Sequence, residues 1–434
     1  MTAIRPNLKL LAPLAAFACT LAVLVSLGGS AEVDAPGRAA AMNVEIPPDA
    51  STDERIAILQ GAVRDGAGGY AALGDAYLQK ARESGDPSYY SRAERSFDAA
   101  LRSNARDVDA VLGAGTLAGL RHDFREQLRL GLEARRLVPG LVAPDPVIAD
   151  AQIELGRYRA AERTIQRMLD LKPNLTSYAR ASYLRELSGD LPGAVAAMRL
   201  AVSAGAAVPE NVAYVQSLLG DLELRRGRPA AARSVYLGAR ARLPGYAPAE
   251  VGLARVEIAA GDLDAAARRL RGVSRRLPQT DYLTLLADVD EARGASGAAA
   301  LDLELVRAQQ RLLRAAGTRP DADLILFEAN HGDPRTAVRL GRRLWADAPS
   351  VRSADALGWA LTRADRPREG LALAGRALRL GSRDPLFNLH AGLTAKAAGR
   401  PGIAAARLRT ALVGRAALSP LEARDARAAL EAVR

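Results

Sequence analysis

The chain has 434 residues, of which 49% are hydrophobic and 4% aromatic, and its formal net charge is +11. Length alone would suggest about three domains, and the hydrophobic fraction excludes a wholly disordered chain. Because alanine and leucine supply most of that fraction, helices are favoured over β-sandwiches and barrels. A single cysteine and three histidines exclude an intramolecular disulfide framework and leave little for a zinc site.

The first expected element is an apolar segment over residues 10–27, with basic residues before it and acidic residues after it. Its length lies between a signal-peptide core of about 7–15 residues and the ~20 residues that span a bilayer. Residues 1–31 are therefore either a single membrane anchor, N-terminus inside and C-terminus outside, or a signal peptide cleaved near Ala31. A lipid-modified Cys19 fits less well, because the apolar run continues past it. Residues 32–50 are predicted to be a flexible linker, and both alternatives place the protein outside the cytoplasm of a bacterial-type cell.

From residue 51 onward a short turn recurs, of the type Gly189-Asp190-Leu191 and Gly261-Asp262-Leu263. Glycine suits the end of one helix, and Asp or Pro suits the start of the next. Five residues after each turn begins there is a small residue, and these positions recur about every 34 residues, with two steps of about 38. The series runs through Ala161, Ala194, Ala232, Ala266, Ala299, Ala337, Gly370 and Ala404. Stepping back from Ala161 extends the series to ten units.

Other positions keep the same period. Prolines twelve residues after the small position are expected to end the second helix of a unit: Pro139, Pro173, Pro244, Pro278 and Pro349. Small residues twelve positions before it, such as Gly220 and Gly358, let two helices approach closely. A larger residue four positions after it, such as Phe97 or Tyr236, is expected to fill the gap between helices.

This pattern resembles the tetratricopeptide-repeat family over residues 56–415, with Leu-Gly pairs that include Gly74, Gly220 and Gly358. The resemblance implies an all-α solenoid of about ten helix–turn–helix units, a right-handed superhelix with a concave groove. We expect the solenoid over 51–415 and a capping helix over 416–434. An insertion around residues 84–87 is expected to lengthen the helix–helix loop of the first unit. The unit at Ala337 matches least well, because Ile325 stands where a small residue belongs.

No residue pattern supports catalysis, a cofactor or a metal. The glycines of residues 113–119 lack a preceding strand, the histidines fall in different units, and no serine has a nucleophile-elbow context. The chain is therefore expected not to be an enzyme. Nearly all of the positive charge lies in residues 301–434, but its arginines are dispersed, so no nucleic-acid partner is expected.

In this family the residue after the small first-helix position faces the groove. Here that position is occupied by Thr116, Asp150, Tyr183, Asp221, Arg255, Asp288, Trp359 and Leu393. Near the C-terminus it becomes apolar and basic, with Trp359, Leu389 and Leu393 beside Arg352, Arg363 and Lys396. An aromatic anchor with arginine beside it is typical of interface hot spots.

Two functional interpretations follow. We expect a protein-binding scaffold whose groove holds a partner segment with apolar and acidic residues; alternatively, Trp359 packs between adjacent units. The second interpretation is a structural or assembly subunit of a cell-envelope or export complex, whose basic C-terminal third contacts an acidic partner or an anionic envelope surface.

Overall fold

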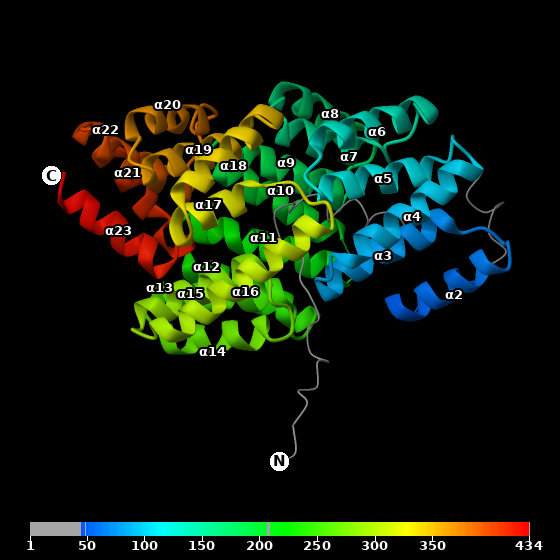
Figure 1. Cartoon of the computed structure of the whole chain (residues 1–434), viewed down its shortest axis with the longest axis horizontal. Coiled ribbons are helices and arrows are strands. Elements are labelled where there is room, and N and C mark those ends of the chain that lie inside the picture. Colours follow the sequence, from blue (N-terminus) through cyan, green and yellow to red (C-terminus); the bar gives the residue numbers. More distant parts are fainter. Residues whose placement is uncertain (1–44, 48, 206–208, 434) are drawn as a thin grey trace, which may run out of the picture.

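The computed structural model describes residues 45–47, 49–205 and 209–433, and every regular element within them is a helix (Figure 1). The segment 1–31, predicted to be an anchor or signal peptide, and most of the predicted linker 32–50 lie outside the described residues. Among the described helices, none combines the length and the apolar character needed to cross a membrane.

The described helices form ten antiparallel pairs, which confirms the predicted repeat fold. The pairs are α3 (Tyr70–Ser84) with α4 (Ser88–Ser103), α5 (Val108–Leu120) with α6 (Phe124–Leu137), α7 (Asp145–Glu154) with α8 (Tyr158–Leu171), α9 (Leu175–Leu187) with α10 (Leu191–Ala204), α11 (Pro209–Arg225) with α12 (Pro229–Arg242), α13 (Ala247–Ala260) with α14 (Leu263–Ser274), α15 (Thr280–Ala292) with α16 (Ser296–Ala315), α17 (Ala322–His331) with α18 (Pro334–Asp347), α19 (Val351–Arg363) with α20 (Pro367–Ala377), and α21 (Pro385–Ala397) with α22 (Pro401–Val413). Helix α2 (Thr52–Arg64) precedes them, and a short 3-10 helix, η1 (Arg415–Ala417), leads into α23 (Pro420–Glu431).

The recurring turn works as its residue types predict. Gly189 takes a positive φ of 80°, which ends α9 without the steric penalty that a Cβ atom would meet. The carboxylate of Asp190 then accepts a hydrogen bond from the backbone N–H of Gly193 at 2.9 Å and caps the start of α10. His122 and Asp365 adopt the positive φ where most other turns have glycine.

Large residues fill the space that paired glycines leave. A Cβ atom on Gly220 of α11 would lie 2.3 Å from the ring of Tyr236, and one on Gly252 of α13 would lie 2.2 Å from it. Phe97 fills the same place against Gly74 and Gly113. One aromatic ring thus contacts the first helix of its own unit and the first helix of the next, which joins consecutive units.

The other repeat positions lie where close packing needs them. Ala161, Ala232, Ala266 and Ala404 are completely buried, and the backbone of Gly358 lies against Gly370. Pro173, Pro244 and Pro278 lie in the loops that follow α8, α12 and α14.

The irregular units depart from the period by changing helix length. The prediction that the insertion around residues 84–87 lengthens a loop is wrong. Three residues connect α3 to α4, just as three connect α5 to α6, and α3 and α4 are instead each longer than α5 and α6. The two longer steps coincide with α11, at 17 residues, and α16, at 20 residues. Ile325 is fully buried in α17, which has only 10 residues.

The superhelix contacts itself after about 190 residues. Four successive turns inside the early units pack against four successive loops between the later units. Gly156 meets Pro349, Gly189 meets Gly381, and Gly227 meets Val413 through their backbones. In the fourth contact, the backbone N–H of Arg319 donates to the carbonyl of Arg121 at 2.9 Å.

Side chains reinforce this seam between superhelical turns. The Tyr158 hydroxyl accepts a hydrogen bond from the backbone N–H of Val351 at 2.7 Å. Arg225 of α11 lies 3.2 Å from the Asp384 carboxylate, and Arg125 donates to the carbonyls of Ala346 and Asp347. The residues of this seam are far apart in sequence, so they close the solenoid into a compact coil.

The C-terminal helix completes the coil. Ser419 and Glu422 form a reciprocal capping box at the start of α23. The helix packs on α22 and α21 as a cap would, and it also contacts α15 across the interior. It therefore closes one side of the coil in addition to covering the last unit.

The seam predicts unequal effects of two alanine substitutions in equivalent turns. Gly189→Ala places a Cβ atom 2.2 Å from the Gly381 carbonyl oxygen, whereas Gly399→Ala, at a similar positive φ, meets nothing within 4 Å. Both variants lose about 1–2 kcal/mol to the positive φ. We expect Gly189→Ala to lose a further ~1–3 kcal/mol from the clash, measured by urea unfolding. Equal losses in the two variants would show that the seam contributes no stability.

Candidate binding cavity

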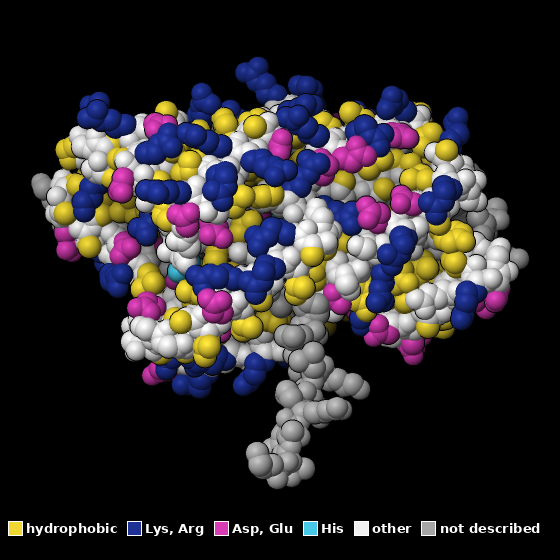
Figure 2. All heavy atoms as spheres, viewed as in Figure 1, with side chains coloured by type: hydrophobic (Ala, Val, Ile, Leu, Met, Phe, Trp, Pro, Cys, Tyr) yellow, Lys and Arg dark blue, Asp and Glu magenta, His cyan; other side chains and the backbone are white. Residues whose placement is uncertain are grey.

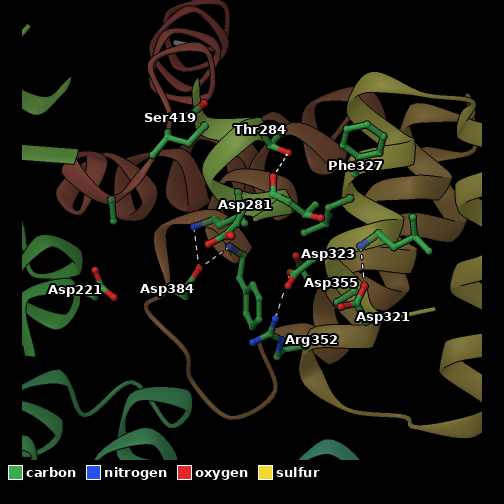
Figure 3. Close-up of a pocket in the computed structure, with 18 of the residues that line it drawn as sticks. Asp221, Asp281, Thr284, Asp321, Asp323, Phe327, Arg352, Asp355, Asp384 and Ser419 are labelled. Atoms are coloured by element: carbon green, nitrogen blue, oxygen red, sulfur yellow. Dashed lines mark hydrogen bonds and ion pairs between the residues drawn. The ribbon is translucent and has the colours of Figure 1, made fainter. Parts of the chain in front are cut away.

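The coil surrounds a partly open cavity of about 480 Å³ (Figure 3). Seven consecutive first helices of the pairs line it, from α9 to α21, together with the loop before α17, η1 and the start of α23. The helices that the family resemblance assigns to the groove therefore do surround the hollow interior.

The lining carries more acidic than basic side chains, although the chain as a whole is basic. Nine carboxylates line the cavity against five arginines. The carboxylates belong to Glu186, Asp221, Asp281, Asp288, Asp321, Asp323, Asp355, Asp384 and Glu422, and the arginines are Arg225, Arg255, Arg314, Arg319 and Arg352. Charge is thus separated, with the negative excess inside.

Two arginines neutralise part of this excess. Arg225 lies 3.1 Å from the Glu186 carboxylate and 3.2 Å from that of Asp384, and it joins α9 to α21. The guanidinium of Arg352, on α19, lies 3.3 Å from the carboxylate of Asp323, on α17. These pairs hold together elements from different parts of the coil, so they have a structural role.

Asp281, in the first turn of α15, is a buried carboxylate of the lining that has no ion-pair partner among the described residues. Its Oδ1 atom is buried without a hydrogen-bond partner among the described residues, and no ion pair joins it to a described cation. Burial raises the pKa of Asp281 to about 7, against the opposing effect of Arg255. Figure 3 shows the carboxylate in the interior, on the same side as Asp323 and Asp355.

Asp288 lies two helical turns further along α15. Its carboxylate is 3.5 Å from Nε2 of His331, and burial raises the pKa of Asp288 to about 6. Burial lowers the pKa of His331, so near neutral pH this imidazole supplies little positive charge. Burial also raises the pKa of Glu422 on α23. The interior therefore becomes more negative as the pH rises through neutrality.

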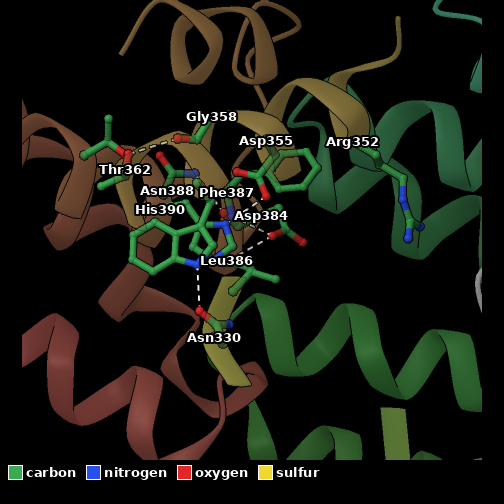
Figure 4. Close-up of polar contacts among 12 residues, drawn as sticks. Asn330, Arg352, Asp355, Gly358, Thr362, Asp384, Leu386, Phe387, Asn388 and His390 are labelled. Carbon is green, nitrogen blue, oxygen red and sulfur yellow. Dashed lines mark hydrogen bonds and ion pairs between the residues drawn. The ribbon is translucent and has the colours of Figure 1, made fainter. Parts of the chain in front are cut away.

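One wall of the cavity includes His390, and a second ring stacks on it from behind that wall (Figure 4). The indole of Trp359 stacks on His390 with 4.6 Å between ring centroids, and its Nε1–H donates to Oδ1 of Asn330 at 2.8 Å. The other side of the network is a 2.8 Å contact between Nδ1 of His390 and the Asp355 carboxylate. Burial opposes a charged imidazole here, but Asp355 outweighs it and raises the pKa of His390.

The predicted hot-spot residues are divided between packing and surface. Trp359 is 9% exposed and lies between α17 and α21, as the alternative interpretation of this residue stated. Arg363 reaches the same place, and its Nε–H donates to the Ala329 carbonyl. Leu389 is buried and Leu393 is half-buried in the packing between units.

Of the predicted cluster, only Arg352 lines the cavity, and Lys396 is exposed on the end of α21. The structure therefore brings Trp359 and Arg363 together but directs them into an inter-unit contact. Their role in binding a partner stays a prediction.

The residue after the small first-helix position, predicted to face the groove, correctly identifies part of the cavity lining. Tyr183, Asp221, Arg255 and Asp288 occupy that position and do line the cavity. Sequence reasoning missed acidic residues at or near the starts of helices, namely Asp281, Asp321, Asp323 and Asp384. The signal was visible, but an acidic residue at a helix start is ordinarily a cap, and Asp321 and Asp384 do cap their helices.

Carboxylates from different helices do not form a metal centre here. Within residues 45–47, 49–205 and 209–433, no group of three or more His, Cys, Asp or Glu side chains has a suitable arrangement. The lining is suited to charge recognition over an extended surface.

The raised pKa of Asp281 predicts a pH-dependent stability. Because the folded state binds this proton more tightly than the unfolded state, the stabilisation is complete below about pH 4 and is lost as the pH rises to about 7. Asp281→Asn removes this dependence, so from pH 5 to pH 8 its free energy of unfolding should gain roughly 2–3 kcal/mol relative to that of the parent chain. Urea unfolding at both pH values measures this, with the exposed Asp98→Asn as control. An equal pH dependence in parent and Asp281→Asn would contradict it.

Comparisons with known proteins agree with the repeat fold. Residues 223–289 match the family model described as tetratricopeptide repeat. Cellulose synthase 1 operon protein C of Komagataeibacter xylinus is 31% identical over 242 residues, which are 54% of this chain. The chain spans 15% of that relative's length.

Solved structures with a similar chain trace include the human IFIT1 dimer with m7Gppp-AAAA, at 16% identity and a TM-score of 0.47. The match covers 72% of this chain and 71% of that one. PilW, a type IV pilus biogenesis factor, has 18% identity and a TM-score of 0.39, covering 48% of this chain and 97% of that one. With a matching family model at its centre and the same helix pair repeated on both sides, the chain is a helical-repeat protein of the tetratricopeptide type.

Proposed function

We propose that this protein is a non-catalytic scaffold that holds a basic segment of a partner protein inside its coil. The observation that carries the proposal is the cavity, whose carboxylates outnumber its arginines and include Asp281, with a buried Oδ1 atom that lacks a hydrogen-bond partner among the described residues. A repeat solenoid offers a long inner surface for contact with another chain.

A lysine or arginine side chain is the partner group that this lining would recognise. A cation beside Asp281 would reduce the cost of burying a carboxylate whose Oδ1 atom has no hydrogen-bond partner among the described residues, and at neutral pH it would favour the ionised form. The net negative charge of the lining would add attraction over a longer range, and the arginine pairs would limit how many cations enter.

The outer surface has the opposite charge and suits a different contact. Exposed arginines are frequent on the second helices of the last three units: Arg335, Arg339, Arg342 and Arg343 on α18, Arg368 and Arg376 on α20, and Arg409 on α22. Figure 2 shows many such side chains along the upper edge of the molecule, where Figure 1 places α20 and α8. We propose this surface, with exposed Arg363 and Lys396, for an acidic partner or an anionic envelope surface.

The setting we propose is a cell-envelope assembly or export complex outside the cytoplasm. The 31% identical relative is named as a cellulose synthase operon protein, which supports a role alongside the proteins of such an operon. The apolar segment 10–27 and its flanking charges support export, by an anchor or by a cleaved signal peptide.

The cavity proposal predicts selective binding of basic peptides. A labelled peptide of alternating alanine and lysine should bind at 150 mM salt, whereas an alanine–glutamate peptide of the same length should not. Since Asp281 ionises around pH 7, affinity for the lysine peptide should rise several-fold from pH 6 to pH 8. Fluorescence anisotropy measures both.

Asp281→Asn should weaken the lysine peptide several-fold and flatten its pH dependence, while Asp98→Asn on the outer helix α4 should change neither. Equal binding of the two peptides, or an unchanged affinity in Asp281→Asn, would contradict a basic ligand.

The envelope proposal predicts the location of the native protein. Fractionation of cells, followed by N-terminal sequencing, should find either the full chain in salt-washed membranes or a soluble form that begins near Glu32. The chain should be accessible to protease added outside the cytoplasmic membrane, and protection of the full chain from that protease would contradict the proposal.

A further inference from the structure

Helix α16 carries an apolar row that nothing in the described chain covers. Its buried face includes Val306 and Leu313, but on another face Leu301 is 70% exposed, Leu305 48% and Leu312 47%. Ala308 lies between them in the same row, so the spacing is four, three and four residues. This is the heptad spacing that places side chains along one seam of a helix pair.

The number of exposed large hydrophobic side chains on α16 is unusual for this molecule. Seven large hydrophobic side chains of the described chain are conspicuously exposed, and three of them share this one helix. Of the other four, Leu171 and Leu200 lie on separate helices, and Ile403 and Val413 lie at opposite ends of α22. An aligned set of exposed leucines is typical of an interaction site, whereas single exposed leucines are ordinary.

Charges beside the row indicate which partner fits it. At 100° per residue, Glu304 and Arg311 lie on the same side of the leucine row. Arg311 is exposed and forms no ion pair with a described residue, and Glu304 is paired only within its own helix, with Arg307.

We infer that α16 pairs antiparallel with α16 of a second copy of this chain. With a two-fold axis between positions 306 and 307, Leu301 faces Leu312 of the other copy and Leu305 faces its Ala308. The same alignment brings Glu304 alongside Arg311 of the other copy, twice by symmetry. A row that matches itself in shape and in charge is what an isologous interface requires.

Pairing would give one assembly two copies of the interior cavity. A partner with two suitable segments would then bind with higher avidity than to one copy. The inference itself uses no residue of the cavity, so it stands or fails apart from the proposed ligand.

The experiment measures the mass of the full-length chain in detergent by sedimentation velocity, with the detergent contribution subtracted. The parent chain should be a dimer, and Leu305→Glu/Leu312→Glu should shift it to monomer, with at least a tenfold weaker self-association. Leu171→Glu/Leu200→Glu, with the same charge added at exposed leucines elsewhere, should remain a dimer.

Charge exchange tests the alignment. Glu304→Arg and Arg311→Glu should each weaken the dimer, and the double variant should restore it, which a merely destabilised fold would not do. A monomeric parent chain would overturn the inference, as would a dimer that Leu305→Glu/Leu312→Glu leaves intact. A parent chain that dimerises only after removal of residues 1–44 would also overturn it, because the row would then be covered by the chain's own N-terminal segment.

Discussion

The structure depends on how closely backbones can approach one another at a small number of repeated positions. Within a unit, glycine or alanine lets two helices meet, and the space that remains is filled by one large side chain, such as Tyr236 between Gly220 and Gly252. Between superhelical turns, Gly156, Gly189 and Gly227 lie directly against carbonyl groups of loops about 190 residues away. The same glycines end a helix and make the coil close.

The closed coil gives the interior its electrostatic character. In an open solenoid the acidic residues at the starts of α15, α17 and α21 would face water, and their pKa values would be ordinary. In the coil they share one cavity, and burial raises the pKa of Asp281 to about 7 and that of Asp288 to about 6. The interior is therefore negative in a protein whose sequence is strongly basic, and its charge changes near neutral pH.

The inner surface, the basic outer helices and the leucine row of α16 give the molecule three different surfaces. They belong respectively to first helices, to second helices of the last units, and to one lengthened second helix. Because stacking requires only the small and large packing positions to be kept, the remaining positions of each helix are free to differ from unit to unit. A scaffold can thus acquire several contact surfaces without a change of fold.

The sequence by itself determined the fold class, the ten helix pairs and the packing role of residues such as Ala161, Ala232 and Gly220, because a local period repeated ten times specifies local structure. It also placed Tyr183, Asp221, Arg255 and Asp288 toward the groove. Only the tertiary structure decided that Trp359 stacks on His390 between units and that Asp281, Asp323 and Asp384 share a cavity. The physical reason is the superhelical closure: its pitch is the sum of small rotations between units, and no single repeat encodes it.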